Sequence, residues 1–438
     1  MTDLPRREPT RAPIWDPNDD RYWDPRDLEG ELRRTFQICH ECRMCVTYCG
    51  SFPILFEAVD AQVDAGRAEG AEHLSAETFH AVSDHCWQCK LCYIKCPYTP
   101  DEGAREQLDF PRLMAREKAQ RARRDGVALV DRVLGEPQLL GQAASGVLAP
   151  LANFVNKERL LRKVTEKISG ISAEFPLPPL ARQSFEDWFA EHRPAPEAGK
   201  AGRVVLFPTC YGDYNFPGVP SAAVRVLEKN GYEVQLPPGR TCCGMPNLDG
   251  GDVARAQRKM EQNIASLIEL VRAGNKVVVP GPTCSYTMRK EWPSYVPGKD
   301  ADAVAESTLD LMEFLDGLRK KGTLNRDFQG GLGKVAYHAA CHLRAQKIAC
   351  PGARVLSQLP NTEVRMVERC SAVDGTWGMK AAFYEEGARY GRKLARALES
   401  EGHDVVVGDC SLAGLRILKE SGEHALHPIE ALARAYGL

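Results

Sequence analysis

The sequence predicts an α+β protein in which a small helical domain precedes a duplicated α/β cysteine-rich region. Three observations predict this organisation. Two short cysteine runs lie within the first hundred residues, short apolar strands alternate with longer helices after residue 200, and one order of strands, helices and cysteines occurs twice in that later part.

Composition sets the broad class. The chain has 438 residues, enough for two or three domains, and its 43% apolar and 26% charged residues are ordinary for globular proteins. A formal net charge of −2, without a basic stripe interleaved with aromatic residues, argues against nucleic acid as a partner. Residues 1–30 are polar and proline-rich, which predicts a flexible arm without a signal peptide and hence a cytoplasmic protein. In that compartment, sixteen cysteines favour metal ligation over disulfides.

Residues 31–109 contain both cysteine runs, each spaced C-x2-C-x2-C-x3-C. This spacing is typical of [4Fe-4S] ferredoxins, in which the fourth cysteine commonly binds the other cluster. Zinc is the alternative, but it normally takes two separated C-x2-C pairs. We therefore predict a helical two-[4Fe-4S] ferredoxin-like domain. Its expected ligands are Cys39, Cys42, Cys45 and Cys96 for one cluster, and Cys86, Cys89, Cys92 and Cys49 for the other.

Residues 110–200 are predicted to form a mostly helical connector. Its charged stretch, residues 112–125, is expected to be a solvated helix face. A second stretch, residues 137–156, contains twenty residues without a charge. Its prolines, glycines and polar residues make it a poor membrane-spanning helix, so we expect a buried or docking helix that does not cross a bilayer.

Residues 201–325 and 326–438 are predicted to be two α/β halves related by duplication. The expected strands of the first half are 203–207, 232–236 and 276–280, with helices at 221–231 and 253–274; those of the second are 334–338, 363–367 and 404–408, with helices at 353–359 and 379–402. Matching cysteines lie 131, 127 and 126 residues apart, from Cys210 to Cys341, Cys243 to Cys370 and Cys284 to Cys410. Each follows a predicted strand, so the halves are expected to present cysteines toward one another or toward a shared pocket.

Three segments together carry a family resemblance: CHECRMCVTYCGSFP, CWQCKLCYIKCP and RTCCGMP. The chain resembles the family of iron–sulfur subunits found in anaerobic glycerol-3-phosphate dehydrogenase, glycolate oxidase and heterodisulfide reductase. The resemblance covers about residues 30 to 425. It implies a cysteine-rich (CCG) domain, duplicated after a two-cluster module, and electron transfer between a dehydrogenase and a membrane quinone pool or another acceptor.

The chain departs from the heterodisulfide reductase pattern, which counts against disulfide cleavage by an unusual cluster: Thr287 and Ala413 replace cysteines, and Arg369-Cys370-Ser371 stands where Cys-Cys-Gly would be. The first half still offers four thiolates for a third cluster, with zinc or no metal as alternatives: Cys210, Cys242, Cys243 and Cys284. The second half offers Cys341, Cys370 and Cys410, either as buried thiols or as ligands of a cluster with a free iron corner or with His338 or His342 as fourth ligand. Cys350 has no counterpart in the repeat and is expected to be an inert core residue.

The favoured function is an electron-transfer subunit, an oxidoreductase component without dehydrogenase activity of its own. The sequence has no G-x-G-x-x-G or P-loop signature for a flavin, nicotinamide or ATP, so the chain needs a partner. The expected partner is a flavin-dependent dehydrogenase or a rubrerythrin-type diiron protein. Contact with a quinone or with the inner face of the cell membrane is a further expectation. The alternatives are a catalytic reductase whose cysteine-rich halves act on a disulfide, quinone or peroxide-linked acceptor, and a redox sensor.

Overall fold

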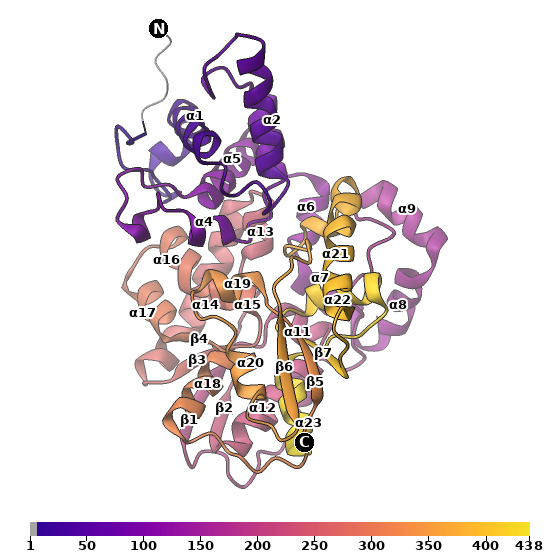
Figure 1. Ribbon diagram of the computed structural model, residues 1–438. Helices are drawn as coiled ribbons and strands as arrows, with labels where there is room; N and C mark the ends of the chain where they lie inside the picture. The colour runs from indigo at the N-terminus through magenta and orange to yellow at the C-terminus, as the bar shows by residue number, and fades with distance from the viewer. Residues whose placement is uncertain (1–6) are drawn as a thin grey trace. The chain divides into compact units, whose positions relative to one another are not determined.

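A computed structural model describes residues 7–438, and the contacts within it separate the chain into two units (Figure 1). Of the described residues, the first unit contains 7–128 together with Asn247–Ala254, and the second contains Leu129–Pro246 and Arg255–Leu438. The predicted fold class is confirmed: a helical domain precedes two α/β repeats built on small parallel sheets.

The first unit is helical and has an aromatic core. Asp24 begins α1 by accepting a hydrogen bond from the backbone N–H of Arg26, with Pro25 at the first helical position, where its missing N–H costs nothing. In the core, the rings of Phe52 and Phe110 stack with centroids 4.7 Å apart. The helices are η1 (Asp20–Trp23), α1 (Pro25–Cys42), α2 (Ser51–Asp64), α3 (Ala76–Asp84), α4 (Leu91–Lys95), η2 (Pro100–Glu102) and α5 (Phe110–Asp125).

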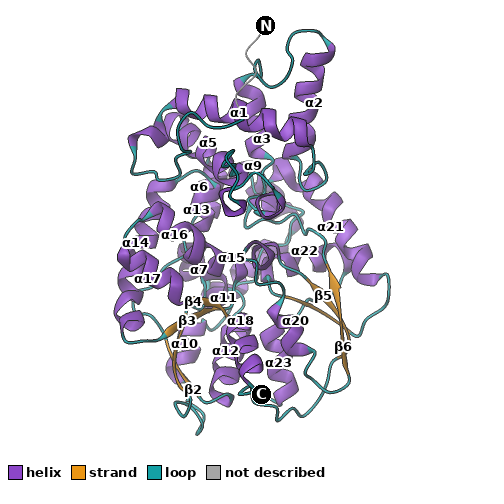
Figure 2. Ribbon diagram, turned by 60° about the vertical axis from the view of Figure 1, so that its left-hand side comes forward, coloured by secondary structure: helices purple, strands orange, loops and turns teal. Residues whose placement is uncertain are grey.

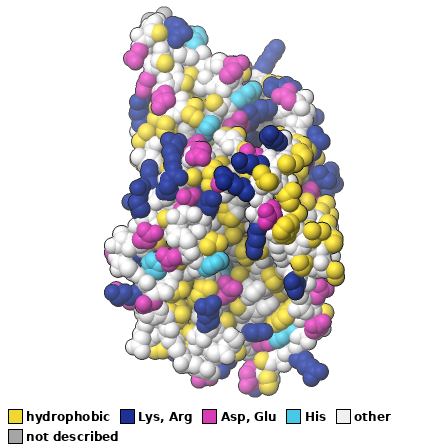
Figure 3. All heavy atoms as spheres, turned by 90° about the vertical axis from the view of Figure 1, so that its right-hand side faces the viewer, with side chains coloured by type: hydrophobic (Ala, Val, Ile, Leu, Met, Phe, Trp, Pro, Cys, Tyr) yellow, Lys and Arg dark blue, Asp and Glu magenta, His cyan; other side chains and the backbone are white. Residues whose placement is uncertain are grey.

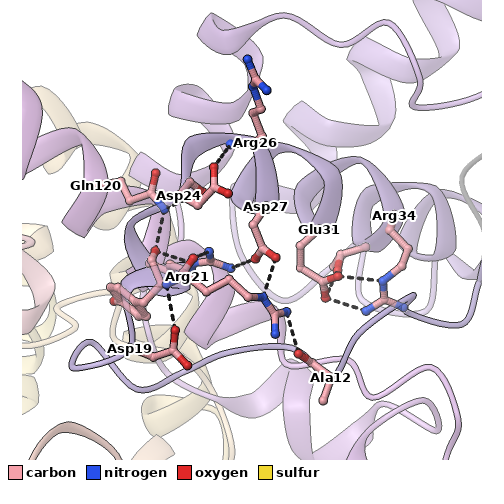
Figure 4. A network of polar contacts seen from close by, with 12 residues as sticks. Ala12, Asp19, Arg21, Asp24, Arg26, Asp27, Glu31, Arg34 and Gln120 are labelled. Carbon is pink, nitrogen blue, oxygen red and sulfur yellow. Dashed lines mark hydrogen bonds and ion pairs between the residues drawn. The ribbon is translucent and has the colours of Figure 1, made fainter.

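Helix α5 differs from its predicted role as a solvated face, because Arg116, Glu117 and Lys118 on it are buried. Arg116 donates to the carbonyl oxygen of Tyr22 at 2.8 Å and pairs with Asp27 at 2.9 Å. Gln120 of the same helix also donates to the Tyr22 carbonyl oxygen, and Figure 4 shows Gln120 and Asp27 among the polar contacts of this region. The prediction was wrong here because the partners of these charges come from other segments, 94 residues away for Arg116, 34 for Glu117 and 32 for Lys118.

The second unit contains two parallel sheets. The strand orders are β2-β1-β3-β4 and β6-β5-β7. All six predicted strands form. Strand β4 was not predicted, because three residues are too few to show a strand pattern. The strands are β1 (Gly202–Leu206), β2 (Tyr232–Gln235), β3 (Lys276–Val279), β4 (Thr308–Asp310), β5 (Gly333–His338), β6 (Thr362–Val367) and β7 (Val405–Gly408).

One apolar core joins the two halves of the second unit. It includes Val204 and Val278 from the first sheet and Val335 and Val407 from the second. Between the sheets, α12 packs against α23 and α18 packs against α20 (Figure 2). The helices of the first half and the junction are α10 (Phe185–Glu191), α11 (Cys210–Tyr214), α12 (Gly218–Lys229), α13 (Met245–Asp249), α14 (Val253–Arg272), α15 (Pro282–Tyr286), the π-helix η4 (Thr287–Glu291), α16 (Trp292–Tyr295), α17 (Lys299–Ser307) and α18 (Leu311–Lys321). Those of the second half are α19 (Cys341–Ala345), α20 (Pro351–Leu356), η5 (Trp377–Met379), η6 (Ala381–Phe383), α21 (Tyr384–Glu399), α22 (Ser411–Ser421) and α23 (Pro428–Tyr436).

The connector forms several short helices that belong to the second unit. They are α6 (Leu129–Leu134), α7 (Pro137–Ala144), η3 (Gly146–Leu148), α8 (Ala149–Lys157) and α9 (Arg159–Ser169). The uncharged stretch 137–156 is therefore divided among α7, η3 and α8. Across residues 7–438, none of the helices has both the length and the apolar character needed to cross a membrane.

Candidate functional site

Four thiols from separate parts of the first unit line one small cavity. Cys39 and Cys42 lie in the last turn of α1, Cys45 follows in the next loop, and Cys96 comes directly after α4. Apolar side chains, among them Phe56, complete the wall. The structure therefore joins three cysteines of the first run with the last cysteine of the second.

A second small cavity has the reciprocal arrangement. Its lining includes Cys86, Cys89 and Cys92 of the second run and Cys49 of the first. Trp87, which is 1% exposed, forms part of the same wall and screens the thiols from water. Each cavity thus takes its four cysteines from both runs.

The loops between these cysteines contain left-handed backbone. Arg43, Gln88 and Lys90 have φ values of 51°, 51° and 62°, a region that residues other than glycine rarely occupy. Alternating right- and left-handed residues turn successive N–H groups to one side and form a nest for an anion. The backbone around the thiols therefore suits a negatively charged group.

Burial and crowding oppose ionisation of these thiols when no metal is bound. Burial, with a smaller contribution from the nearby cysteines, raises the pKa of Cys39 and Cys92 well above the usual value. The same causes raise the pKa of Cys45 to about 12. A cationic centre removes this penalty because coordination deprotonates a thiol outright.

The donor set of each cavity fits a [4Fe-4S] cluster, which takes four thiolates, one on each iron. Among residues 7–438, no three Cys, His, Asp or Glu side chains are grouped closely enough to hold a single metal ion.

In the second unit, the candidate cysteines lie past the carboxyl ends of the strands, where sites form in parallel sheets. Cys210 begins α11 after β1, and Cys284 lies in α15 after β3. Cys341 begins α19 after β5, and Cys410 caps α22 after β7. The loops after β2 and β6 carry Cys242, Cys243 and Cys370.

The four cysteines of the first half form a continuous series of thiol contacts. The sulfur atoms of Cys210 and Cys242 lie 3.8 Å apart, and the free thiol of Cys243 lies within hydrogen-bonding reach of those of Cys242 and Cys284. Hydrogen bonds from Cys210 and Cys243, together with the cation of Lys259, lower the pKa of Cys242.

Gly244 follows these cysteines for a steric reason. Its φ is +92°, and a Cβ atom there would lie 3.2 Å from the carbonyl oxygen of Ala256. The turn after Cys242 and Cys243 therefore requires glycine.

The second half brings three thiols together and adjoins the first. Burial, followed by the charges of Cys370, Asp374 and Cys410, raises the pKa of Cys341. Cys284 of the first half contributes in the same way to the raised pKa of Cys410, after burial. The two sets of cysteines therefore share one region of the second unit.

The two candidate histidines differ in their partners. The Nδ1 atom of His342 lies 2.9 Å from the hydroxyl of Thr283, and its ring stacks on Tyr286 with centroids 5.0 Å apart. In His338, Nε2 donates to the carbonyl oxygen of Arg369 at 2.9 Å, and the buried Nδ1 has no hydrogen-bond partner within the described part of the chain. Cys350 lies apart from both sets, in the apolar core that joins the halves.

Comparison with known families shows which family the chain belongs to. The model for a cysteine-rich domain matches residues 204–289 and again 335–416, and the model for a 4Fe-4S dicluster domain matches residues 35–101. The chain belongs to this family of iron–sulfur subunits. The resemblance found in the sequence motifs is thereby confirmed.

The named relatives include subunits of two enzymes and a lactate utilization protein. A subunit of the anaerobic glycerol-3-phosphate dehydrogenase of Escherichia coli (strain K12) is 27% identical over 308 residues, which cover 69% of this chain and 76% of that protein. A subunit of the fumarate reductase (CoM/CoB) of Methanothermobacter marburgensis is 27% identical over 236 residues, or 52% of this chain and 44% of that protein. Lactate utilization protein A of Geobacillus kaustophilus is 27% identical over 217 residues, or 48% of this chain and 87% of that protein.

Two residues beside the cysteines were not among the sequence candidates. After burial, the charges of Cys210, Cys242, Cys284 and Cys410 raise the pKa of Tyr211, so this side chain lies near thiols of both halves. Lys259, which lowers the pKa of Cys242, pairs with Glu136 at 3.0 Å. The position of Tyr211 next to Cys210 was a usable signal, whereas Lys259 on α14 has no local pattern that marks it.

Proposed function

We propose that the chain relays single electrons between a flavin dehydrogenase partner and a quinone or another acceptor. The observation that supports this most is the pair of four-thiol cavities in the first unit, each drawing on both cysteine runs. Bound [4Fe-4S] clusters would supply one-electron redox chemistry there. The chain itself has no sequence signature for a flavin or nicotinamide site.

The proposed ligands follow the composition of each cavity. One cluster is held by Cys39, Cys42, Cys45 and Cys96, and the other by Cys86, Cys89, Cys92 and Cys49. Apolar side chains would shield the clusters from water, most completely at the site beside Trp87, and the nest-like loops would offer N–H groups to a bound anion.

A third cluster is proposed in the first cysteine-rich half, because its four thiols form a continuous series of neighbours: Cys210, Cys242, Cys243 and Cys284. For the second half we propose a less complete site at Cys341, Cys370 and Cys410. His338 is the better candidate for a fourth ligand there, since its buried Nδ1 lacks a partner among the described residues while that of His342 is close to Thr283.

The proposed partner is a flavin dehydrogenase, in line with the dehydrogenase and reductase complexes that the relatives' names describe. A rubrerythrin-type diiron protein is the alternative partner. Reduction of a quinone to a quinol consumes two electrons, which come from the substrate of the dehydrogenase, and two protons, which come from water. Because lipophilic quinones reside in the bilayer, the proposal includes peripheral contact with the inner face of the cell membrane.

Metal content tests the proposal. Anaerobically purified protein is expected to contain at least about eight irons per chain, the content of two cubane clusters. Reduction should give the electron paramagnetic resonance signals of spin-coupled cubanes. Stoichiometric zinc with iron near zero would overturn the proposal.

A further inference from the structure

An exposed apolar surface covers α7, η3, α8 and α9, and Figure 3 shows hydrophobic side chains gathered on this face beside Lys and Arg. We define the apolar surface as the exposed large apolar side chains of residues 139–168. Val147 is 96% exposed, Leu160 79% and Ile168 68%. Patches of contiguous apolar side chains on a folded protein usually mark a binding surface.

Helix α9 is inverted relative to a helix that packs on a protein core. Its apolar residues Leu160, Leu161, Val164 and Ile168 face outward, whereas its one fully buried residue is Arg162. The Arg162 guanidinium donates to the carbonyl oxygen of Phe175 at 2.9 Å and to that of Ser172. These buried hydrogen bonds of Arg162 therefore hold the helix with its apolar face outward.

The charges around this face favour a lipid partner. Lys157, Arg159, Lys163 and Lys167 are exposed, and within the described residues none of the four forms an ion pair. From 157 to 168 the chain has five basic and two acidic residues, although its formal net charge is −2. Exposed leucines beside unpaired cations are typical of helices that lie in the interface of an anionic bilayer.

A cavity of about 630 Å³ opens through this surface. Leu140, Leu148, Leu151 and Ile168 are exposed and also line the cavity, so its mouth lies among the apolar side chains. The lining is mostly apolar, with a few polar groups, which suits an apolar ring that carries carbonyl oxygens.

Tyr211 connects this cavity with the cysteine-rich site. It lines the cavity, follows Cys210 of the first half directly, and packs against the same apolar cluster as Cys410 of the second half. Its hydroxyl makes no hydrogen bond to another described residue, so it can donate one to a ligand carbonyl.

We propose that the apolar surface docks on an anionic lipid bilayer and that the cavity receives the ring of a lipid-borne quinone beside Tyr211. This membrane and quinone proposal rests on the proposed electron-transfer function only for the source of the electrons that would reduce the quinone. Docking and ligand entry depend on the residues of α7–α9 and on the cavity lining.

Docking is tested by flotation of the anaerobic full-length protein with phosphatidylcholine vesicles, with and without phosphatidylglycerol. Leu160→Glu with Ile168→Glu should lower binding at least about tenfold, because the apolar face is lost. Lys163→Gln with Lys167→Gln should lower binding to anionic vesicles by about tenfold and have little effect with neutral lipid. Met366→Glu with Leu438→Glu, which places two charges at exposed apolar sites elsewhere in the second unit, should bind as wild type does.

Wild-type protein that fails to float with anionic vesicles would overturn the docking proposal. So would a dimer, detected by light scattering, that dissociates when Leu160 and Ile168 are replaced, because the surface would then bind a second copy.

Quinone entry is tested by binding of the fluorescent quinone analogue 2-heptyl-4-hydroxyquinoline N-oxide, measured by fluorescence quenching. Ala152→Trp, which fills the cavity, should raise the Kd at least about tenfold, and Tyr211→Phe should raise it about fivefold through loss of one hydrogen bond. Leu438→Trp is the control. The absence of quenching with wild type, or equal affinity in Ala152→Trp, would overturn this part.

These readouts separate the inference from the proposed function. Protein with both ferredoxin-type clusters that neither floats nor binds the analogue would refute the inference and leave electron transfer standing. Protein without cubane iron that still floats and binds would refute the proposed function alone.

Discussion

Cys49 belongs to the first cysteine run, yet its side chain lines the cavity that contains Cys86, Cys89 and Cys92. Replacing Cys49 with Ser is expected to remove about four irons from this second site and leave the first site loaded, because the hydroxyl is a poor cluster ligand. Iron analysis with electron paramagnetic resonance of the reduced protein measures the loss. If Cys49→Ser and Cys45→Ser abolished the same signal, the crossed ligand sets would be wrong.

His427 is a second residue with a measurable consequence, because it is buried and neutral. Burial lowers its pKa to about 4, while Nε2 lies 2.8 Å from the carbonyl oxygen of Pro280 and Nδ1 accepts from the N–H of Ile429 at 3.2 Å. The unfolded chain takes up a proton near pH 6.5, before the folded chain does. The stabilisation is therefore complete above that pH and is lost as the pH falls toward 4.

Denaturant unfolding at pH 7 and pH 5 measures this effect. The wild-type free energy of unfolding should fall by about 2 kcal/mol more than that of His427→Asn, which retains a capping acceptor at the start of α23. Equal pH dependence in the two proteins would show that His427 titrates normally in the folded state.

Residue spacing predicted the cysteine sites better than it predicted their surroundings. The C-x2-C-x2-C-x3-C runs indicated which thiols would meet, because the first three cysteines share one local loop and the fourth commonly joins the other set. Tyr211 and Arg162 gained their roles from contacts between distant segments, and Arg162 looked like any other surface charge in a basic helix.

At the scale of secondary structure, α5 shows how a charged helix can form part of a core. Replacing Arg116 with Ala should lower the free energy of unfolding by about 1.5 to 3 kcal/mol, because Asp27 and the Tyr22 carbonyl each lose a buried charged donor and keep only Arg21 and Gln120, respectively. Arg124→Ala on the same helix is the control, since its side chain is 64% exposed and should contribute less than about 1 kcal/mol. Chemical denaturation compares the two, and similar losses would contradict the assigned network.

The strands were predictable for a different reason from the helices. Short runs of Val bounded by turn residues identify buried parallel strands, and β1, β3 and β7 begin and end within a residue or so of their predicted limits. The outward face of α9 was not predictable, since amphipathic periodicity shows that a helix has an apolar side but not what that side contacts.

At the scale of the whole molecule, the duplicated halves share one core and bring two unequal sets of thiols together. The nearly constant offsets between matching cysteines indicated this arrangement from the sequence.

The two cysteine-rich halves differ in their number of candidate thiols, four in the first and three in the second, which gives a further prediction. Cys243→Ser should lower the iron content of the second unit more than Cys350→Ser, because Cys243 contacts two other thiols whereas Cys350 lies in the apolar core. Iron analysis of the full-length variants measures the difference. Equal losses would mean that the ligands of the cysteine-rich halves are misassigned.

Electron transfer from a partner is the central claim, and reconstitution tests it most directly. The full-length, anaerobically purified chain is mixed with a flavin dehydrogenase encoded beside its gene, the dehydrogenase substrate is added, and cluster absorbance is followed. The clusters are expected to bleach only when both proteins and the substrate are present. Oxidation of a hydroxy acid or polyol by the purified chain alone, at enzyme-like rates, would contradict it.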